Sequence, residues 1–194
     1  MRNDRNFEVL FVFPSELGWM SMGMLGAVVR RLSFGHPSAG AAIQAIAPAD
    51  VVGRDPTKQQ RDVVQRLQRY AEGVPDDFCD LLVDSDDLTE FQARVLKACR
   101  KIPYGGTLTY GELAAIARSP GAARAVGSCM AGNCVPLIIP CHRVVRAGGD
   151  IGPYSAAGGS ATKRRLLDIE AAGVAERGTA TPIARRKPGR RTCR

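Results

Sequence analysis

Apolar residues near the start of the chain follow the two-residue spacing of strands, and further along they change to the spacing of helices. Three segments have strand character: Phe7–Phe13, Leu17–Met22 and Met24–Phe34. The glycine between the last two, Gly23, predicts a hairpin turn. Ser38–Ile46 predicts a short alanine-rich helix, and Pro56–Glu72 predicts a longer one closed by Gly73. Phe78–Val83 predicts a returning strand.

Helix signals become explicit after residue 88. Two capping boxes, in which a threonine is followed three residues later by Gln or Glu, predict helix starts at Thr89 and Thr109. Ser119–Gly121 interrupts the second helix, and Ala122–Ala131 predicts another. Two short helices joined by a three-residue turn with a glycine are typical of a helix-turn-helix unit. Ser160 is expected to cap a last helix that runs through Ala172 and is ended by Gly173.

These elements predict an α+β fold with three parts. Residues 1–85 are expected to form a small, supportive α/β domain, in which no motif suggests chemistry. Residues 86–174 are expected to form a mainly helical domain with the helix-turn-helix unit and the candidate chemistry described below. Residues 175–194 lack apolar periodicity and predict a disordered basic tail.

Charge is distributed unevenly over the 194 residues, whose hydrophobic and charged fractions of 45% and 24% are typical of a globular protein. Residues 1–90 carry a net charge of −5, residues 91–174 of +7 and residues 175–194 of +6. A basic second half favours a polyanionic partner, with a merely solvated basic face as the alternative. Phe7–Phe13 is too short to span a membrane and lacks a signal-peptide pattern, so a cytoplasmic location is expected.

The cysteine pattern argues against a metal centre. The six cysteines form no CxxC pair, and the chain has only two histidines. Reduced thiols are therefore expected, and neither a metal nor another cofactor is indicated.

One segment combines a thiol with an acid–base group. The apolar run Val135–Ile139 predicts a buried strand that ends at Pro140, and Cys141, His142 and Arg143 follow directly. Unpaired cysteines are usually small buried hydrophobic residues. The proline, histidine and arginine favour a nucleophile instead, because positive charge and an acid–base partner promote the thiolate. Adjacent side chains of a strand point to opposite faces, so Cys141 and His142 need a turn or a bridging water to cooperate.

The second helix of the helix-turn-helix unit is unusual for a reader of DNA sequence. Such readers carry several Asn, Gln, Arg or Lys side chains that contact base edges. Here Arg124 stands among small residues, which let a helix approach a sugar-phosphate backbone or a narrow groove closely. DNA binding without sequence specificity is therefore expected. The candidate contact residues are Arg124, Ala123, Ala125, Gly127 and Ser128.

Five short motifs in a fixed order carry a family resemblance. They are Thr109–Ala114, Ala122–Gly127, Gly132-Asn133, Ile139–Val145 and Tyr154-Ser155. From about Leu88 to Glu170 the chain resembles the O6-alkylguanine-DNA alkyltransferases, also called methylated-DNA–protein-cysteine methyltransferases. The resemblance implies a DNA repair protein that flips an alkylated guanine out of the duplex and takes the alkyl group irreversibly onto its own cysteine, in a single turnover.

The resemblance also assigns roles in alkyl transfer. Cys141 would be the acceptor nucleophile, His142 its base through a water, and Glu170 the group that orients the imidazole. Asn133 would brace the turn that holds the cysteine, and Tyr110 would donate to the guanine ring as negative charge develops there.

Further residues would hold the flipped base. Tyr154 would line the pocket wall, with Pro140 also at the substrate, and the backbone amide of Ser155 would face the guanine oxygen. The carbonyls of Cys141 and Val144 would accept the exocyclic amine. Arg124 would fill the space that the base vacates in the stack.

Double-stranded DNA containing O6-alkylguanine is the implied partner, with no membrane contact. A monomer is expected, associated with the nucleoid through its DNA binding. One alternative is a non-catalytic sensor or regulator on the same scaffold, against which the presence of Cys141 argues. Another is a Cys-His hydrolase, which the adjacent Cys-His arrangement, the basic charge and the helix-turn-helix unit disfavour.

Overall fold

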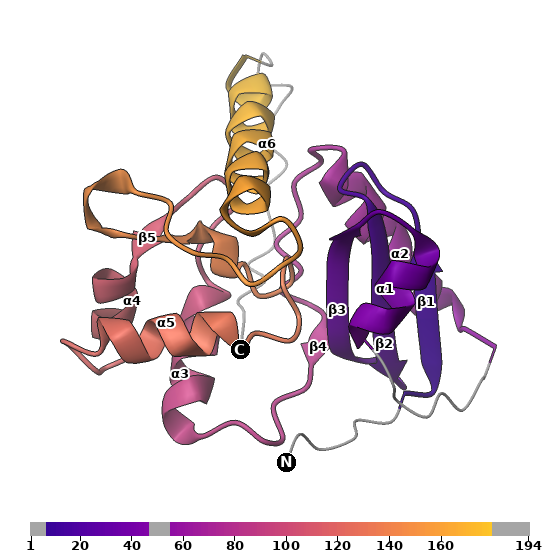
Figure 1. The fold of residues 1–194 in the computed structure, drawn as a ribbon, viewed down its shortest axis with the longest axis horizontal. Helices are drawn as coiled ribbons and strands as arrows, with labels where there is room; N and C mark the ends of the chain where they lie inside the picture. The colour runs from indigo at the N-terminus through magenta and orange to yellow at the C-terminus, as the bar shows by residue number, and fades with distance from the viewer. Residues whose placement is uncertain (1–6, 47–54, 180–194) are drawn as a thin grey trace, which may run out of the picture.

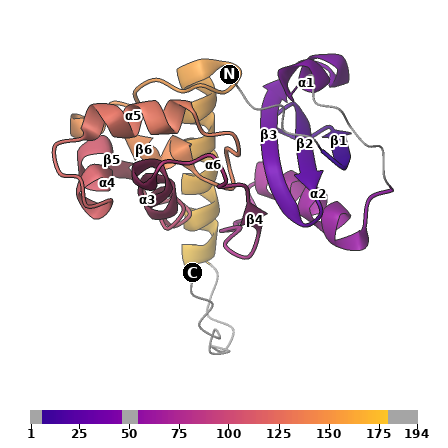
Figure 2. The same cartoon turned by 90° about the horizontal axis from the view of Figure 1, so that it is seen from below.

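The computed structural model describes residues 7–46 and 55–179. A four-stranded sheet with helices α1 and α2 lies at one end of the molecule, and helices α3, α4 and α5 lie at the other (Figure 1). The last helix, α6, stands between them in both views (Figure 2). The predicted α+β class is confirmed. The predicted division at residue 85 stays a prediction, since side chains from both halves share one core cluster.

The sheet has the order β1-β2-β3-β4, and both of its faces are covered. Its strands are β1 (Val9–Phe13), β2 (Trp19–Leu25), β3 (Val28–His36) and β4 (Leu82–Val83), antiparallel except for the parallel β3–β4 pair. In β2 the buried Met20, Met22 and Met24 alternate with Ser21, whose hydroxyl donates to the Ala42 carbonyl of α1 (Ala39–Ile46) at 2.6 Å. Because strand side chains alternate between faces, the methionines face the main core while α1 covers the other side.

The predicted hairpin is present, but its predicted turn was wrong. The chain turns at Gly26, whose φ is +55°, and Gly23 lies inside β2. A Cβ at Gly23 would fall 2.5 Å from the ring of Phe7, so the glycine lets that ring pack against the strand.

Helix α2 (Lys58–Ala71) begins after Thr57, which forms a capping box with Gln60. Pro56 therefore lies just before the cap and not in the first turn. The strand predicted for Phe78–Val83 was wrong apart from its last two residues, because Phe78 has a φ of +50° and its ring packs on Tyr70.

Helices α3 (Glu90–Cys99), α4 (Tyr110–Ile116) and α5 (Ala123–Ala131) confirm the predicted helices of the second half. Both predicted capping boxes are formed, at Thr89 and at Thr109. Two short strands, β5 (Leu108–Thr109) and β6 (Val144–Val145), pair in parallel next to α4.

The predicted end of the last helix at Gly173 was wrong. Helix α6 runs over Gly159–Thr179, so it begins before Ser160 and includes the first residues of the predicted tail. A Cβ at Gly173 would lie 2.7 Å from the Gly73 carbonyl oxygen and 2.8 Å from the Tyr104 hydroxyl. This glycine thus permits close packing inside the helix. The rest of the tail, residues 180–194, lies outside the described residues.

Two sequence expectations concern the thiols and the membrane. Cys99, Cys129, Cys134 and Cys141 are free thiols, whereas Cys79 is disulfide-bonded, contrary to the expectation of reduced thiols throughout. Over residues 7–46 and 55–179, no helix combines the length and the apolar character that crossing a membrane requires.

Candidate active site

The segment before Cys141 is buried, as predicted, but it is not a strand. Leu137 has a φ of +70°, and the amide of Ile139 donates to the carbonyl of Val135 at 3.0 Å, which closes a five-residue turn. Cys141–Arg143 then forms a short 3-10 helix, η1. Buried strands and buried turns of this length have the same apolar composition, so the sequence pattern did not separate them. Cys141 and His142 therefore lie on a turn and not on an extended strand.

Asn133 ties this turn to the end of α5. Its side-chain amide donates to the Ile139 carbonyl at 2.8 Å and lies 3.2 Å from the Cys141 sulfur, while its oxygen accepts from the Val135 amide at 3.1 Å. Burial raises the pKa of Cys141, and the contact with Asn133 opposes that rise because a donor at the sulfur favours the thiolate.

Asn133→Ala is expected to destabilise the fold by about 1–3 kcal/mol, since the buried Val135 amide loses its acceptor and the Ile139 carbonyl keeps only the Cys141 amide as donor. It should also move the pH profile of Cys141 alkylation by iodoacetamide to higher pH. Urea unfolding and peptide mass mapping measure the two effects. An unchanged profile would show that the amide does not act on the sulfur.

Cys141 lines a pocket of about 170 Å³. The other lining residues come from α5 and from the loop before α6: Gly127, Met130, Ala131, Pro153, Tyr154 and Ser155. The predicted wall residues Tyr154 and Ser155 therefore lie in the same pocket as the thiol. The Tyr154 hydroxyl is buried, and burial together with the neighbouring Cys141 sulfur raises its pKa well above the ordinary value.

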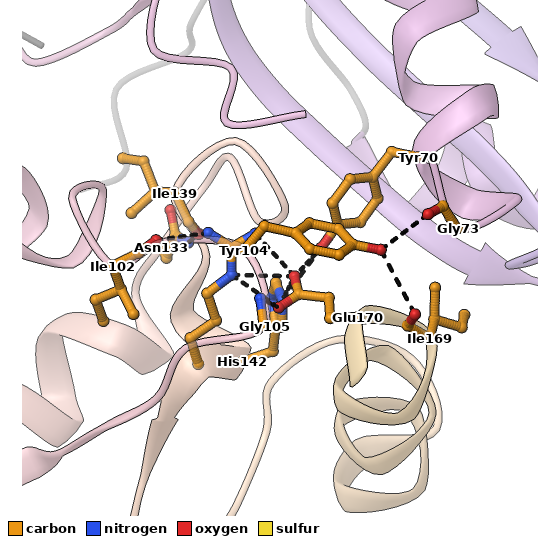
Figure 3. A network of polar contacts seen from close by, with 11 residues as sticks. Tyr70, Gly73, Ile102, Tyr104, Gly105, Asn133, Ile139, His142, Ile169 and Glu170 are labelled. Atoms are coloured by element: carbon orange, nitrogen blue, oxygen red, sulfur yellow. Dashed lines mark hydrogen bonds and ion pairs between the residues drawn. The ribbon is translucent and has the colours of Figure 1, made fainter. Parts of the chain in front are cut away.

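His142 is fully buried and donates through Nε2 to the Glu170 carboxylate at 2.8 Å (Figure 3). An ionised carboxylate only accepts hydrogen bonds, so the proton of a neutral imidazole belongs on Nε2. Burial lowers the pKa of His142, which keeps the ring neutral near pH 7. Nδ1 is buried and has no hydrogen-bond partner within the described part of the chain, which leaves a lone pair that can accept a proton.

Arg143 pairs with Glu170. Its guanidinium donates to the carboxylate through Nη2 at 2.8 Å and through Nε at 3.0 Å, and its Nη1 donates to the Ile102 carbonyl at 2.7 Å. The Gly105 amide donates to the other carboxylate oxygen at 2.9 Å. Burial alone would raise the pKa of Glu170, but the hydrogen bonds from His142 and Arg143 outweigh it and lower the pKa to about 2. Glu170 is therefore an anion at neutral pH.

Tyr70 of α2 reaches the same carboxylate from the first half of the chain. Its hydroxyl donates to Glu170 Oε1 and lies 3.2 Å from His142 Nε2. No motif in the first 85 residues suggested a role at the candidate site, yet Tyr70 from this part of the chain contacts Glu170 and His142. No local sequence signal could have found this contact, because its partners are 100 residues apart.

Lys163 is a second residue that the sequence analysis missed. It is fully buried, donates to the Val144 carbonyl at 2.5 Å and lies 5.6 Å from the centre of the Tyr110 ring. Burial raises the pKa of Tyr110, so its phenol holds its proton. Lys163, Leu166 and Glu170 share the buried face of α6, so a lysine at helical spacing from an apolar residue is the signal that could have marked it.

Helix α5 faces the solvent and the pocket at once. Its buried residues are Val126, Cys129 and Met130. Of the predicted DNA contacts, Arg124, Ala125 and Ser128 are exposed, and Ala123 and Gly127 are half-buried. Since Gly127 also lines the pocket, this one helix connects the exposed surface with the thiol.

The chain is similar to known proteins, over its second half in sequence and over most of its length in structure. Residues 90–172 match the model of the 6-O-methylguanine DNA methyltransferase DNA binding domain. The chain is 45% identical over 107 residues to a methylated-DNA–protein-cysteine methyltransferase of Mycobacterium tuberculosis, covering 55% of this chain and 62% of that protein. It is 39% identical over 110 residues to that of Methanothermobacter thermautotrophicus, covering 57% and 60%. These alignments thus span less than two thirds of the curated relatives.

Solved structures extend the match to most of the chain. The M. tuberculosis OGT in complex with DNA superposes with a TM-score of 0.64 at 32% identity, covering 84% of this chain and 93% of that one. The O6-methylguanine-DNA methyltransferase of Pyrococcus kodakaraensis gives a TM-score of 0.63 at 25% identity, covering 83% and 97%.

Proposed function

This chain belongs to the family of methylated-DNA–protein-cysteine methyltransferases, and we propose that it repairs DNA by moving the alkyl group of O6-alkylguanine onto Cys141. The observation that carries the proposal is a pocket whose wall holds this thiol, next to a buried imidazole with an unpartnered Nδ1 and a carboxylate on its other nitrogen. In this proposal Cys141 is the nucleophile, His142 the base and Glu170 the group that orients the base.

In the proposed reaction, His142 Nδ1 takes the thiol proton through a water, and Glu170 stabilises the resulting imidazolium. The thiolate attacks the alkyl carbon, so a sulfur–carbon bond forms as the carbon–oxygen bond breaks. The electron pair goes to the purine, and the Tyr110 phenol donates the proton that neutralises it. The imidazolium then loses its proton to solvent and the Tyr110 phenolate takes one from solvent, so that the net transfer is of the thiol proton to the purine. Because water does not readily displace a thioether, the protein reacts once.

The pocket residues give the base its proposed place. The Ser155 amide faces the guanine oxygen, Tyr154 lines the wall, and Pro140 begins the turn below the base. The carbonyls of Cys141 and Val144 accept the exocyclic amine. The Val144 oxygen already accepts from Lys163, but a carbonyl oxygen has two lone pairs and can take both donors.

Double-stranded DNA is the proposed partner, bound through α5. The exposed Arg124 fills the gap that the flipped base leaves, and its small neighbours let the helix approach the groove. We propose that the protein acts as a monomer, in the cytoplasm and associated with the nucleoid.

The proposal is tested by incubating the full chain with a duplex that contains one O6-methylguanine. The peptide with Cys141 is expected to gain one methyl group, the guanine to be restored, and the reaction to stop at one equivalent. Repeated turnover, or methylation of another residue, would contradict irreversible transfer to Cys141. Binding of the duplex without any mass gain would indicate the non-catalytic sensor.

Arg124→Ala is expected to slow transfer from duplex DNA by roughly tenfold or more, because the flipped base then leaves an unfilled gap; unstacking costs a few kcal/mol. The same variant should transfer from free alkylguanine at nearly the normal rate. Single-turnover rates on both substrates measure the difference, with Arg118→Ala, a second arginine at the helix-turn-helix unit, as control. Equal slowing on both substrates would show that Arg124 serves the pocket.

A further inference from the structure

The Tyr70 hydroxyl stands at the meeting point of the acid–base pair. It donates to Glu170 Oε1, and its oxygen lies 3.2 Å from His142 Nε2, which itself lies 2.8 Å from the same carboxylate oxygen. Figure 3 shows the three side chains converging on this point. Glu170 does not need Tyr70 to stay in place, because Arg143 and the Gly105 amide already hold both carboxylate oxygens. The hydroxyl therefore does more than fix the carboxylate.

The direction of the hydrogen bonds indicates what it does. Since the phenol gives its proton to Glu170, its lone pairs face the N–H of His142, which is shared between the carboxylate oxygen at 2.8 Å and the phenol oxygen at 3.2 Å. Such a chain, from imidazole to phenol to carboxylate, is cooperative, because each donation makes the donor oxygen a better acceptor. A positive imidazole gains more from this chain than a neutral one.

The other groups around His142 do not supply the same hydrogen bond as the Tyr70 hydroxyl. The charged or titratable neighbours are Glu170 and Lys163 of α6, Arg143 and Cys141 of η1, and Tyr70 of α2. Cys99 of α3 adds no charge, since burial raises the pKa of its thiol well above neutrality. Arg143 and Lys163 are cations and oppose an imidazolium. Among the described residues, Glu170 and the Tyr70 oxygen favour it, together with the Cys141 thiolate that forms in the same step.

We propose that Tyr70 is a positioning residue of the alkyl-transfer site, whose hydroxyl completes a hydrogen-bonded chain that stabilises the imidazolium formed when Cys141 gives up its proton. This inference rests on the proposed function for its biological meaning. The first half of the chain thereby takes part in the chemistry of a nucleophile that the second half carries.

Tyr70→Phe tests the proposal in the full-length protein, because it keeps the ring against Phe78 and Tyr104 and removes only the hydroxyl. The readout is the alkylation of Cys141 by iodoacetamide as a function of pH, followed by peptide mass mapping. The variant is expected to react about fivefold more slowly at neutral pH, the effect of one buried hydrogen bond, and its profile should move to higher pH by about half a unit or more.

Tyr104→Phe is the matched control. Its hydroxyl donates to the Gly73 carbonyl at 3.1 Å, so the variant also loses a tyrosine hydroxyl where the two halves meet, and its pH profile is expected to stay in place. A merely structural role of Tyr70 would lower the melting temperature and leave the profile unmoved, which would overturn the proposal. A shift to lower pH would overturn it as well.

A second measurement needs no reaction at all. The chain has only two histidines, so the ¹⁵N signals of His142 can be followed with His36 as internal reference. Tyr70→Phe should lower the pH at which the His142 ring takes up a proton, and an unchanged titration would contradict the proposal. Neither readout uses alkylated DNA. The test of Tyr70 therefore remains valid if the proposed repair activity is not found. Likewise, a negative result for Tyr70 would not contradict the repair activity.

Discussion

Cys141→Ser is expected to abolish alkyl transfer while leaving DNA binding within about twofold of the original affinity. An alcohol stays protonated where a thiol ionises, so the rate should fall on the order of a thousandfold or more. Binding should survive because the exposed residues of α5 are untouched. Single-turnover transfer from a methylated duplex and fluorescence anisotropy with the same duplex measure the two effects.

Cys134→Ser is the control for this variant. Cys134 is a free, half-buried thiol close in sequence, and its sulfur lies 3.5 Å from the Gly132 carbonyl oxygen, where a serine hydroxyl can also donate. Its transfer rate is expected to stay near that of the unchanged protein. Transfer that persists in Cys141→Ser would assign the acceptor to another residue and overturn the proposed chemistry.

Glu170→Gln is expected to cost about 3–5 kcal/mol of stability at pH 7, because it leaves the buried Arg143 without its counter-charge. The ionised carboxylate also makes the stability of the unchanged protein depend on pH. Its pKa falls from 4.5 to about 2 on folding, which corresponds to about 3 kcal/mol at about 1.4 kcal/mol for each pKa unit. That contribution is present above pH 4.5 and is lost as the pH falls toward 2.

Urea unfolding from pH 7 down to pH 3 measures both effects. The unchanged protein should lose stability over this range, and Glu170→Gln should lose less because it has no carboxylate to protonate. Glu112→Gln is the control, since Glu112 accepts the Thr109 amide at an exposed capping box and an amide oxygen can take its place. Equal free energies of unfolding for Glu170→Gln and the unchanged protein would show that the ion pair adds no net stability.

Local signals in the sequence predicted local structure well. The capping boxes at Thr89 and Thr109 form because each needs only residues three apart. The α+β class and the family follow from element order and motif spacing. The apolar run before Pro140 was wrongly predicted to be a strand. Its apolar composition reflects burial, and burial does not determine the backbone conformation. Gly173 was wrongly predicted to end the last helix. Glycine is favoured both at helix ends and at close contacts between segments, and here the close contact is the reason for it.

Contacts between distant residues explain the rest of what was missed. The motif pointed to Cys141 and His142, and the resemblance added Glu170. Tyr70 looked like one more helix residue, although it completes the network around the carboxylate. The pairing of Arg143 with Glu170 was also hidden, because an arginine beside a cysteine suggests a direct effect on the thiol. The pattern of residues in a single sequence does not show which distant side chains folding brings into contact.

The late position of Glu170 has a consequence for the protein during its synthesis. A ribosome releases the cysteine well before the carboxylate, and the tyrosine that meets the carboxylate has emerged 100 residues earlier. Until α6 docks, the histidine therefore lacks the anion that orients it. Under the proposed function, a nascent chain thus carries Cys141 before the His142–Glu170 pair can activate it, and the reactivity of the thiol is expected to appear late in folding.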